Sequence, residues 1–248
     1  MARALAVAGS SVALTGRSGE RARQVAADLP GAIGLPLDVR SEASVAAAVQ
    51  EAWSRLGGVD MLVNNAGIGM RTVNPGFMTE PQGFWLVSPA GFRDVIETNL
   101  TGYFLMAREI TPRMLATGAG RIVNVSSYTA RVPEPFCAPY SAAKAALVNV
   151  TRNLSRAYGS EGICANCVLP GLTYTEGAAS VFEEAMAATG RSENALVESM
   201  LRRAPIDVGR MGTASEVAAA VAFLCSARAS WITGVVLPVD GGTIRSAP

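Results

Sequence analysis

The chain has 248 residues, 50% of them hydrophobic and 17% charged, and its 21 Lys and Arg residues are balanced by 20 Asp and Glu residues, which excludes the basic surface of a typical nucleic-acid-binding protein. It contains no histidine, which excludes Ser-His-Asp and Cys-His catalysis and the H-E-x-x-H zinc site. We therefore expect one large α/β domain over residues 1–248, with no metal site, whose partner is a small molecule or another copy of the chain.

Residues 1–14 combine one arginine with small apolar residues. Gly9, Ser10 and Ser11 interrupt the apolar run, so we interpret this segment as the end of a helix followed by a strand rather than as a secretory signal. No run reaches the ~18 apolar residues that a membrane-spanning helix needs. These features favour a cytoplasmic protein that does not bind a membrane.

Short apolar runs then alternate with longer helical patterns, which is typical of βαβ units and a parallel sheet. The predicted strands lie at residues 11–15, 32–37, 61–64, 121–126, 163–169 and 235–239. The predicted helices lie at residues 19–28, 41–56, 89–116, 140–158, 178–202 and 214–226. Ser41, Ser88 and Thr213 stand at helix starts as candidate N-caps.

Two connections, residues 68–89 and 172–212, are too long to be simple turns. Both begin at the carboxyl end of a predicted strand, where open parallel sheets bind their ligands. We expect them to be lids or binding elements. The alternative is that they are tolerated surface insertions.

Cys164 and Cys167 form a C-x-x-C pattern inside the strand-like run 163–169. A redox pair is expected at the start of a helix, where the helix dipole lowers a thiol pKa. We therefore interpret the four cysteines of the chain as packing residues in a reducing cytoplasm.

Tyr140 and Lys144 lie four residues apart on a predicted helix, with Ser127 upstream. Residues at i and i+4 are neighbours on a helix, and a lysine cation beside a tyrosine favours the phenolate and lowers a pKa that is ordinarily about 10. Tyr140 is therefore a candidate proton shuttle. On its own, the Y-x-x-x-K pattern also fits an amphipathic helix without any chemistry.

Further polar and glycine residues follow the predicted elements in a fixed order. Asn64-Asn65-Ala66-Gly67 follows a strand, Asn99 lies on a helix, Ser127 follows the next strand, and Pro170-Gly171 closes another. Together with Tyr140 and Lys144, this order and spacing resemble the short-chain dehydrogenase/reductase family over about residues 11–242. The resemblance implies a Rossmann-like doubly wound parallel sheet and NAD(P)-dependent interconversion of a carbonyl and a secondary alcohol.

The resemblance also implies catalytic roles. Tyr140 would be the general acid/base at the substrate oxygen, and Ser127 would hold that oxygen by a hydrogen bond. Lys144 would lower the pKa of Tyr140 and bind the nicotinamide ribose, while Asn99 would anchor a water between the lysine and solvent. Ser126 would be the structural member of the Ser126-Ser127 pair, as the spacing favours Ser127.

The cofactor-binding residues follow from the same resemblance. Asp38 and Val39 would bracket the adenine ring. The backbone of Asn65, Ala66 and Gly67 would approach the adenosine ribose. The segment Pro170–Leu172, which includes Gly171, would run beside the nicotinamide carboxamide, and the Thr175 hydroxyl would bond the carboxamide or the phosphates.

The choice of cofactor depends on Thr15-Gly16-Arg17-Ser18, at the end of the first predicted strand. An NAD-specific site places an acid there to bind the ribose 2′-hydroxyl, but this segment has none. Arg17 could instead pair with a 2′-phosphate, so we expect NADP, with NAD possible. The alternative is that Arg17 is a solvated turn residue.

Family members begin with a strand, a Thr-Gly-x-x-x-Gly-x-Gly loop and a helix whose N-terminus binds the pyrophosphate. Residues 1–9 match only the later turns of that helix, so we expect roughly twenty residues, with the central first strand and the phosphate loop, to be missing. Either the sequence is a truncated record of an active enzyme, or the chain is a non-catalytic dehydrogenase-like scaffold. The retained catalytic set favours the first, and the DNA upstream of Met1 would decide.

The substrate is not identified by the sequence. Aromatic and methionine side chains in the two long connections could line an apolar pocket for a ring or chain carbonyl, or could equally be core or interface residues. These residues are Phe77, Phe84, Trp85, Tyr174, Phe182, Met186 and Met200. We also expect a homo-oligomer, a dimer or tetramer, formed through the apolar helix 140–158 and the C-terminal strand.

Overall fold

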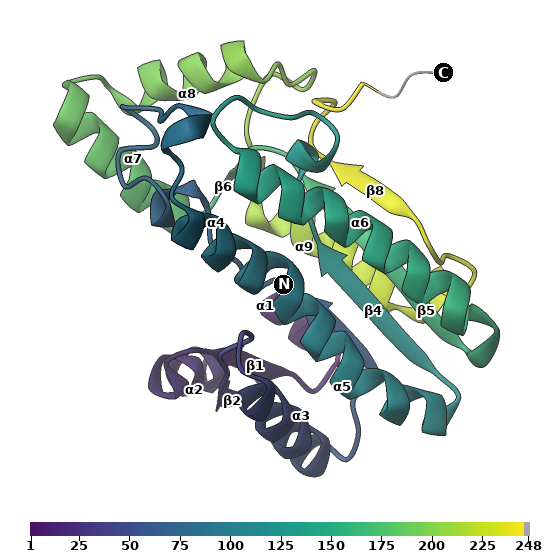
Figure 1. Cartoon of the computed structure of the whole chain (residues 1–248). Helices are drawn as coiled ribbons and strands as arrows, with labels where there is room; N and C mark the ends of the chain where they lie inside the picture. Colours follow the sequence, from purple (N-terminus) through teal and green to yellow (C-terminus); the bar gives the residue numbers. More distant parts are fainter. Residues whose placement is uncertain (246–248) are drawn as a thin grey trace.

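A computed structural model describes residues 1–245, apart from the side chain of Arg203 (Figure 1). The strands are β1 (Ala13–Gly16), β2 (Ile33–Pro36), β3 (Met61–Asn64), β4 (Gly120–Val125), β5 (Ile163–Pro170), β6 (Thr173–Tyr174), β7 (Gly212–Thr213) and β8 (Val236–Val239). The helices are α1 (Ala2–Val7), α2 (Gly19–Ala27), α3 (Glu42–Leu56), α4 (Pro89–Ile96), α5 (Gly102–Thr117), α6 (Ala138–Tyr158), α7 (Glu176–Thr189), α8 (Glu193–Arg203) and α9 (Ala214–Cys225).

The predicted strands and helices are confirmed within a few residues, with two differences. The helix predicted at 89–116 is interrupted by a π-helical turn, Glu97–Thr101, that separates α4 from α5. The helix predicted at 178–202 is two helices, because Gly190 ends α7 in the left-handed conformation with φ 68°. The short strands β6 and β7 were not predicted, since two residues carry no alternation pattern.

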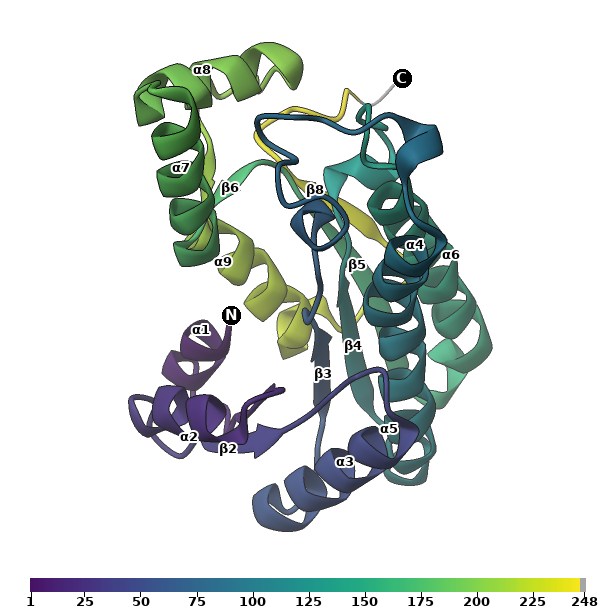
Figure 2. The same cartoon turned by 60° about the vertical axis from the view of Figure 1, so that its left-hand side comes forward.

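The strands pair in parallel in three sheets. The largest has four strands in the order β3-β4-β5-β8, β1 pairs with β2, and β6 pairs with β7. Figure 2 shows β2 and α2 to the left of β3, with α3 below it. Within residues 1–245, no strand pairs with the edge of β3 opposite β4 or with the edge of β1 opposite β2.

The core lies on both faces of the four-stranded sheet. Ile122 and Val123 are adjacent on β4 and both fully buried, and they point to opposite faces. Ile122 packs in a cluster with residues of α3 and α5, whereas Val123 packs in a cluster with residues of α9. Burial on both faces explains why the strands read as continuous apolar runs.

A buried polar network ties the sheet to α6 under the site. Asn64 Nδ2 donates to Asn124 Oδ1 at 2.9 Å, and Asn124 Nδ2 donates to Thr151 Oγ1 at 2.9 Å. Asn64 Nδ2 also lies 3.4 Å from the backbone oxygen of Tyr103. Because these bonds satisfy polar groups where water is excluded, they fix β3, β4, α5 and α6 relative to one another.

Candidate active site

The candidate catalytic residues meet at the carboxyl end of β4. Ser127 follows β4 directly, while Tyr140 and Lys144 lie one turn apart near the N-terminus of α6. Asn99 lies in the π-helical turn before α5 and is fully buried. The fold therefore brings together side chains from three separate segments of the chain.

Ser127 accepts two hydrogen bonds from Thr129, one from the backbone N–H at 3.2 Å and one from Oγ1 at 3.1 Å. With its acceptor positions used in this way, the Ser127 hydroxyl proton is left to be donated. The preceding Ser126 is used differently, because its Oγ donates to the backbone oxygen of Lys144 at 2.7 Å. This arrangement agrees with the assignment of Ser126 as the structural member of the pair.

Tyr140 is mostly buried, and burial raises the pKa of its phenol, because removal from water disfavours the phenolate. Interaction with the Ser127 side chain acts in the opposite direction on the same pKa. We expected Lys144 to lower this pKa, but the Lys144 ammonium lies 5.6 Å from the centroid of the Tyr140 ring and bonds other groups. In this structure Ser127 is thus the residue that favours the phenolate.

Lys144 is 3% exposed, and burial lowers the pKa of its amine to about 7. Its Nζ donates to the backbone oxygen of Val125 at 2.8 Å and to the Tyr103 hydroxyl at 3.3 Å. Both partners lie on the sheet side of α6. Sequence reasoning did not identify Tyr103, although its position four residues after Asn99 places it on the same side of the helix.

Asn99 donates from Nδ2 to the backbone oxygens of Ile68 at 2.9 Å and Val95 at 3.0 Å. Its Oδ1 is buried and has no hydrogen-bond partner among the described residues. A Cβ placed on Gly67 would lie only 2.5 Å from this oxygen, so Asn99 provides a packing reason for the glycine. A buried acceptor without a donor is unusual and indicates a place for a small ligand or water.

The ends of β1, β2 and β3 carry the residues expected to bind the nucleotide. Asn65, Ala66 and Gly67 are exposed after β3, so their backbone is open to a ligand. Arg17 is exposed after β1. Val39 after β2 is only 7% exposed, because it packs against Gly102 of α5, where a Cβ would lie 2.6 Å from Val39 Cγ2.

Asp38 is held by an arginine that sequence reasoning missed. Arg40 donates to both carboxylate oxygens of Asp38, from Nε at 3.1 Å and from Nη2 at 2.9 Å. These bonds lower the pKa of Asp38 to about 2, and the charge of Arg17 acts in the same direction. The D-x-R spacing at the end of a strand is the sequence feature that could have indicated this ion pair. Two arginines therefore lie near the ends of β1 and β2.

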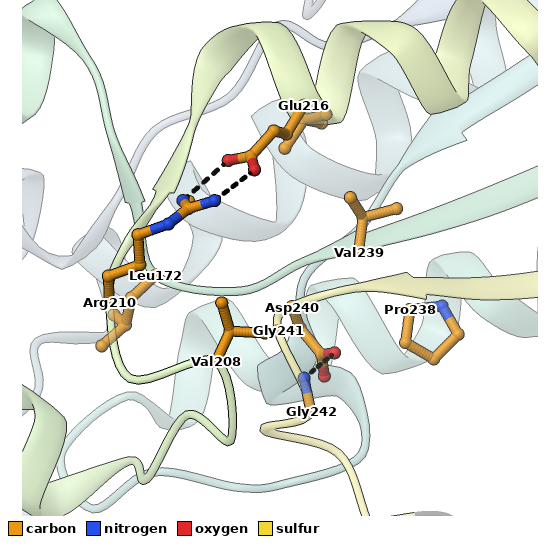
Figure 3. A pocket seen from close by; sticks show the side chains of 11 residues that line it. Leu172, Val208, Arg210, Glu216, Pro238, Val239, Asp240, Gly241 and Gly242 are labelled. Carbon is orange, nitrogen blue, oxygen red and sulfur yellow. Dashed lines mark hydrogen bonds and ion pairs between the residues drawn. The ribbon is translucent and has the colours of Figure 1, made fainter.

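The end of β5 approaches the loop after β8 very closely, because a Cβ on Gly171 would lie 2.7 Å from Asp240 Cα. Leu172 and this loop line a cavity of about 320 Å³ (Figure 3). Asp240 folds the loop by accepting hydrogen bonds from the backbone N–H of Gly242 at 3.1 Å and Ile244 at 2.7 Å. Pro170 ends β5 beside Gly171.

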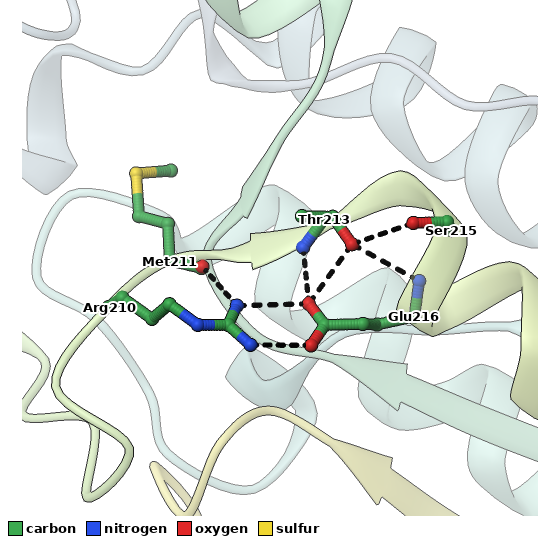
Figure 4. Close-up of polar contacts among 5 residues, drawn as sticks. All are labelled: Arg210, Met211, Thr213, Ser215 and Glu216. Carbon is green, nitrogen blue, oxygen red and sulfur yellow. Dashed lines mark hydrogen bonds and ion pairs between the residues drawn. The ribbon is translucent and has the colours of Figure 1, made fainter.

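Arg210 and Glu216 at the edge of this cavity form an ion pair (Figure 4). Arg210 donates to both carboxylate oxygens of Glu216, at 2.6 and 3.1 Å, and Glu216 completes a capping box with Thr213 at the start of α9. Thr175 likewise caps α7, since its Oγ1 accepts from Ala178 N at 3.1 Å. Its hydroxyl proton remains available to a ligand.

The two long connections face each other across a cavity of about 570 Å³, lined by Gly69–Thr72, Phe77 and Met78 from the first and by Gly177 and Val181 from the second. An ion pair between Arg71 and Glu184, at 2.9 Å, joins the two connections. We therefore interpret them as binding elements rather than as unrelated surface insertions.

The aromatic and methionine residues of these connections divide into three groups. Phe77 lines the cavity, whereas Phe182 is 3% exposed and packs with Met186 and Met200 in a core cluster between α7 and α8. Phe84 and Trp85 are 69% and 83% exposed. Tyr174 stacks on Phe182 with ring centroids 5.8 Å apart.

The sequence also raised expectations about the cysteines, possible metal ligands and possible membrane-spanning helices. Within the described residues no disulfide joins the cysteines, and Cys164 and Cys167 both lie on β5, where residues three apart point to opposite faces. The described residues contain no cluster of His, Cys, Asp and Glu that could hold a metal ion. None of the helices over residues 1–245 is long and apolar enough to cross a membrane.

Comparison with known proteins shows the family. The pattern of the family described as "Enoyl-(Acyl carrier protein) reductase" matches residues 1–243. The 3-oxoacyl-[acyl-carrier-protein] reductase FabG of Aquifex aeolicus (strain VF5) is 35% identical over 247 residues, covering 98% of this chain and 90% of that protein. The chain belongs to the short-chain dehydrogenase/reductase family.

Two solved structures agree with this assignment. A 3-ketoacyl-(acyl-carrier-protein) reductase from Brucella melitensis complexed with NADH has a TM-score of 0.82 and 33% identity, covering 98% of this chain and 91% of that one. A gluconate 5-dehydrogenase from Burkholderia cenocepacia J2315 in complex with NADP and tartrate has a TM-score of 0.81 and 30% identity, with 98% and 88% covered. The predicted α/β, Rossmann-like fold class is confirmed, and the chain is an oxidoreductase of a family whose members bind nicotinamide cofactors.

Proposed function

We propose that this short-chain dehydrogenase/reductase interconverts a carbonyl and a secondary alcohol, with Tyr140 as the general acid/base. The observation that carries the proposal is the convergence of Ser127, Tyr140 and buried Lys144 at the carboxyl end of β4, beside the exposed backbone of Asn65–Gly67. A nicotinamide cofactor, when bound, supplies or accepts the hydride.

The residues of the chain handle the oxygen and its proton. A carbonyl that is being reduced develops alkoxide character, which requires a hydrogen-bond donor and a proton source at that oxygen. Ser127 has its acceptor positions filled by Thr129 and is left as a donor, and Tyr140 carries the proton that is delivered. In the opposite direction, Tyr140 removes the proton from the alcohol.

Lys144 and Asn99 assist the proton transfer without contacting the substrate oxygen. In this proposal the Lys144 ammonium binds the nicotinamide ribose, while Ser127 favours the Tyr140 phenolate. Asn99 Oδ1, which is buried without a partner among the described residues, suits a water that connects the lysine to solvent. The backbone at Pro170–Leu172 and the Thr175 hydroxyl complete the nicotinamide side.

We further propose that NADP is preferred over NAD. Arg17 is exposed at the end of β1, and its positive charge helps to lower the pKa of Asp38 at the end of β2. A 2′-phosphate bound between these two strand ends would therefore lie near a cation. The Asp38 carboxylate is neutralised by its ion pair with Arg40, which reduces the repulsion that it would otherwise exert on a phosphate.

A strand between β1 and β3 is also part of the proposal. The facing edges of these strands are unpaired within residues 1–245, whereas the backbone N–H and C=O groups inside a sheet are normally paired. We propose that a further strand, with its phosphate-binding loop, fills this place in the active enzyme. The same gap is the one observation that favours the alternative function, a non-catalytic scaffold.

Calorimetric titration with NADPH tests this part of the proposal. We expect the 248-residue chain to bind NADPH weakly or not at all, and protein extended by such a strand and loop to bind it. Hydrogen exchange should then show slower exchange of the β3 amides in the extended protein. Tight binding by the 248-residue chain would contradict the need for the strand.

The remaining properties are proposed from surface and composition. The outer edge of β8 is unpaired within the described residues, which together with α6 supports a homo-oligomer, and light scattering that shows a stable monomer would contradict it. The lack of a disulfide among the described residues suits a cytoplasmic location. The partly apolar lining of the larger cavity, with Met70, Phe77, Met78 and Val181, suits a ring or chain carbonyl.

The direct test of function is turnover of a panel of ketones and secondary alcohols with NADPH or NADP, and with NADH or NAD. We expect oxidation or reduction of the nicotinamide with at least one apolar substrate class. A cofactor-saturated protein that turns over none of the panel would support the scaffold instead.

A further inference from the structure

Lys144 is the only lysine in the sequence, against 20 arginines. It is also 3% exposed, so this amine has to be kept in place and charged where water is largely excluded. Its hydrogen-bond partners therefore decide both its position and its protonation.

Two of the three N–H bonds of the ammonium have identified acceptors. One is the Val125 backbone oxygen at 2.8 Å, and the other is the Tyr103 hydroxyl at 3.3 Å. The same Nζ also lies 4.8 Å from the centroid of the Tyr103 ring, within the range of a cation–π interaction. Tyr103 thus contacts the ammonium with both its oxygen and its ring.

Tyr103 is itself fixed mainly by burial, with two long hydrogen-bond contacts. It is 2% exposed, its hydroxyl lies 3.4 Å from the Val125 oxygen, and its backbone oxygen accepts from Asn64 Nδ2 at 3.4 Å. Because the Tyr103 proton is directed at Val125, the lone pairs of its oxygen face the ammonium. The phenol is consequently an acceptor for Lys144 and not a competing donor.

We propose that Tyr103 is a positioning residue, which holds the Lys144 ammonium against the end of β4 by a hydrogen bond to its hydroxyl and by contact with its ring. This rests on the proposed function only in assigning Lys144 a catalytic role. Fixing two N–H bonds leaves the third for the ligand side of the site.

Other groups that face Lys144 supply part of its support, because the Val125 carbonyl accepts the shorter of the two hydrogen bonds and Cys167 acts to raise the pKa of the amine. Tyr140 on α6 presents its ring at 5.6 Å, and Cys167 on β5 is a buried thiol whose pKa is raised to about 11 by burial. Val125 contributes a neutral carbonyl. Burial alone lowers the pKa of Lys144, so loss of the Tyr103 hydroxyl should lower it further.

The single lysine makes the test direct. Protein labelled with ¹³Cε-lysine gives one side-chain signal, whose pH titration reports the Lys144 pKa. We expect Tyr103→Phe to move the midpoint down by about one pH unit, since a hydrogen bond to the charged form is lost. Tyr103→Leu, which also removes the ring, should move it further, so Phe should restore part of the effect.

Tyr158→Phe is the matched control. Tyr158 is a partly buried tyrosine at the far end of α6, where it packs on the α3–α5 core, and its loss of a hydroxyl should leave the midpoint unchanged. An unfolded variant would be recognised by a midpoint near the free-lysine value of about 10.4 and by loss of near-UV circular dichroism. In that event the intermediate substitution Tyr103→Trp, which keeps a ring face, provides the comparison with Tyr103→Leu.

A Tyr103→Phe midpoint equal to that of the parent protein would overturn the proposal, as would equal midpoints in Tyr103→Trp and Tyr103→Leu where Phe does not fold. The experiment needs neither substrate nor turnover, so its failure is distinct from failure of the proposed function. Where turnover is measurable, the alkaline limb of the kcat profile should move to lower pH in Tyr103→Phe and not in Tyr158→Phe.

Discussion

Thr129 donates both its backbone N–H and its hydroxyl to Ser127, at 3.2 and 3.1 Å. The 3-10 turn Tyr128–Ala130, which begins directly after Ser127, creates this geometry. A serine whose lone pairs are engaged in this way is oriented as a donor before any substrate arrives, which is what stabilisation of a developing alkoxide requires.

Thr129→Val should therefore reduce kcat without unfolding the protein. The substitution keeps the shape of the side chain but removes a hydrogen bond worth about 1 kcal/mol, so we expect a decrease of roughly 3- to 10-fold. Thr129→Ser, which keeps the hydroxyl, is the matched control and should retain most of the activity. Steady-state kinetics of both variants make the comparison, and equal activities would show that the Thr129 hydroxyl does not orient Ser127.

Gly67→Ala should displace the Asn99 side chain, because the new Cβ would lie 2.5 Å from Oδ1. We expect a loss of about 1–3 kcal/mol in the free energy of unfolding, together with weaker cofactor binding. Gly69→Ala is the control, as a Cβ there meets no atom within 4 Å. Denaturant unfolding of the two variants should separate them clearly, and similar stabilities would mean that the loop after β3 adapts without strain.

Lys144→Met should stabilise the protein at neutral pH while it removes activity. Burial lowers the folded-state pKa of Lys144 to about 7, so between that pH and the unfolded value the unfolded chain binds more protons than the folded chain. The stability of the parent protein therefore rises with pH across this window, and the advantage of Met should shrink. Thermal melts at pH 7 and pH 9.5 measure the difference, and an advantage that grows with pH would contradict the buried, partly deprotonated lysine.

Arg17→Ala should weaken NADPH binding more than NADH binding, by about 1–3 kcal/mol for a charge-assisted contact to the 2′-phosphate. Arg55, an exposed arginine at the end of α3, offers a control substitution that changes net charge equally. Titrations with both cofactors decide the matter. Equal effects of Arg17→Ala on the two cofactors would identify Arg17 as a solvated turn residue.

Local patterns in the sequence predicted most of the fold. The predicted strand at 61–64 coincides with β3, because a buried parallel strand is a short apolar run between turns. Ser41, Ser88 and Thr213 cap their helices as predicted, since an N-cap needs only a side chain three residues before its N–H donor. The break at Gly190 was missed because periodicity continues across it in the sequence.

The residues that hold the site residues in place were harder to predict. Tyr140 and Lys144 lie four residues apart, so a helix brings them together from sequence alone. Tyr103 lies far from Lys144 in the sequence and meets it only because α5 and α6 pack on the same face of the sheet. The pairing of Asp38 with Arg40 was missed for a different reason, since a turn conformation rather than a helix or strand decides it.

The central claim, that Tyr140 moves the proton, is tested most directly by Tyr140→Phe in protein that binds the cofactor. Only a hydroxyl is lost, so we predict that NADPH affinity by calorimetry stays within about twofold. The value of kcat should fall by about 10²- to 10⁴-fold, which is typical of a lost general acid/base. A Tyr140→Phe variant with near-normal kcat would contradict the mechanism.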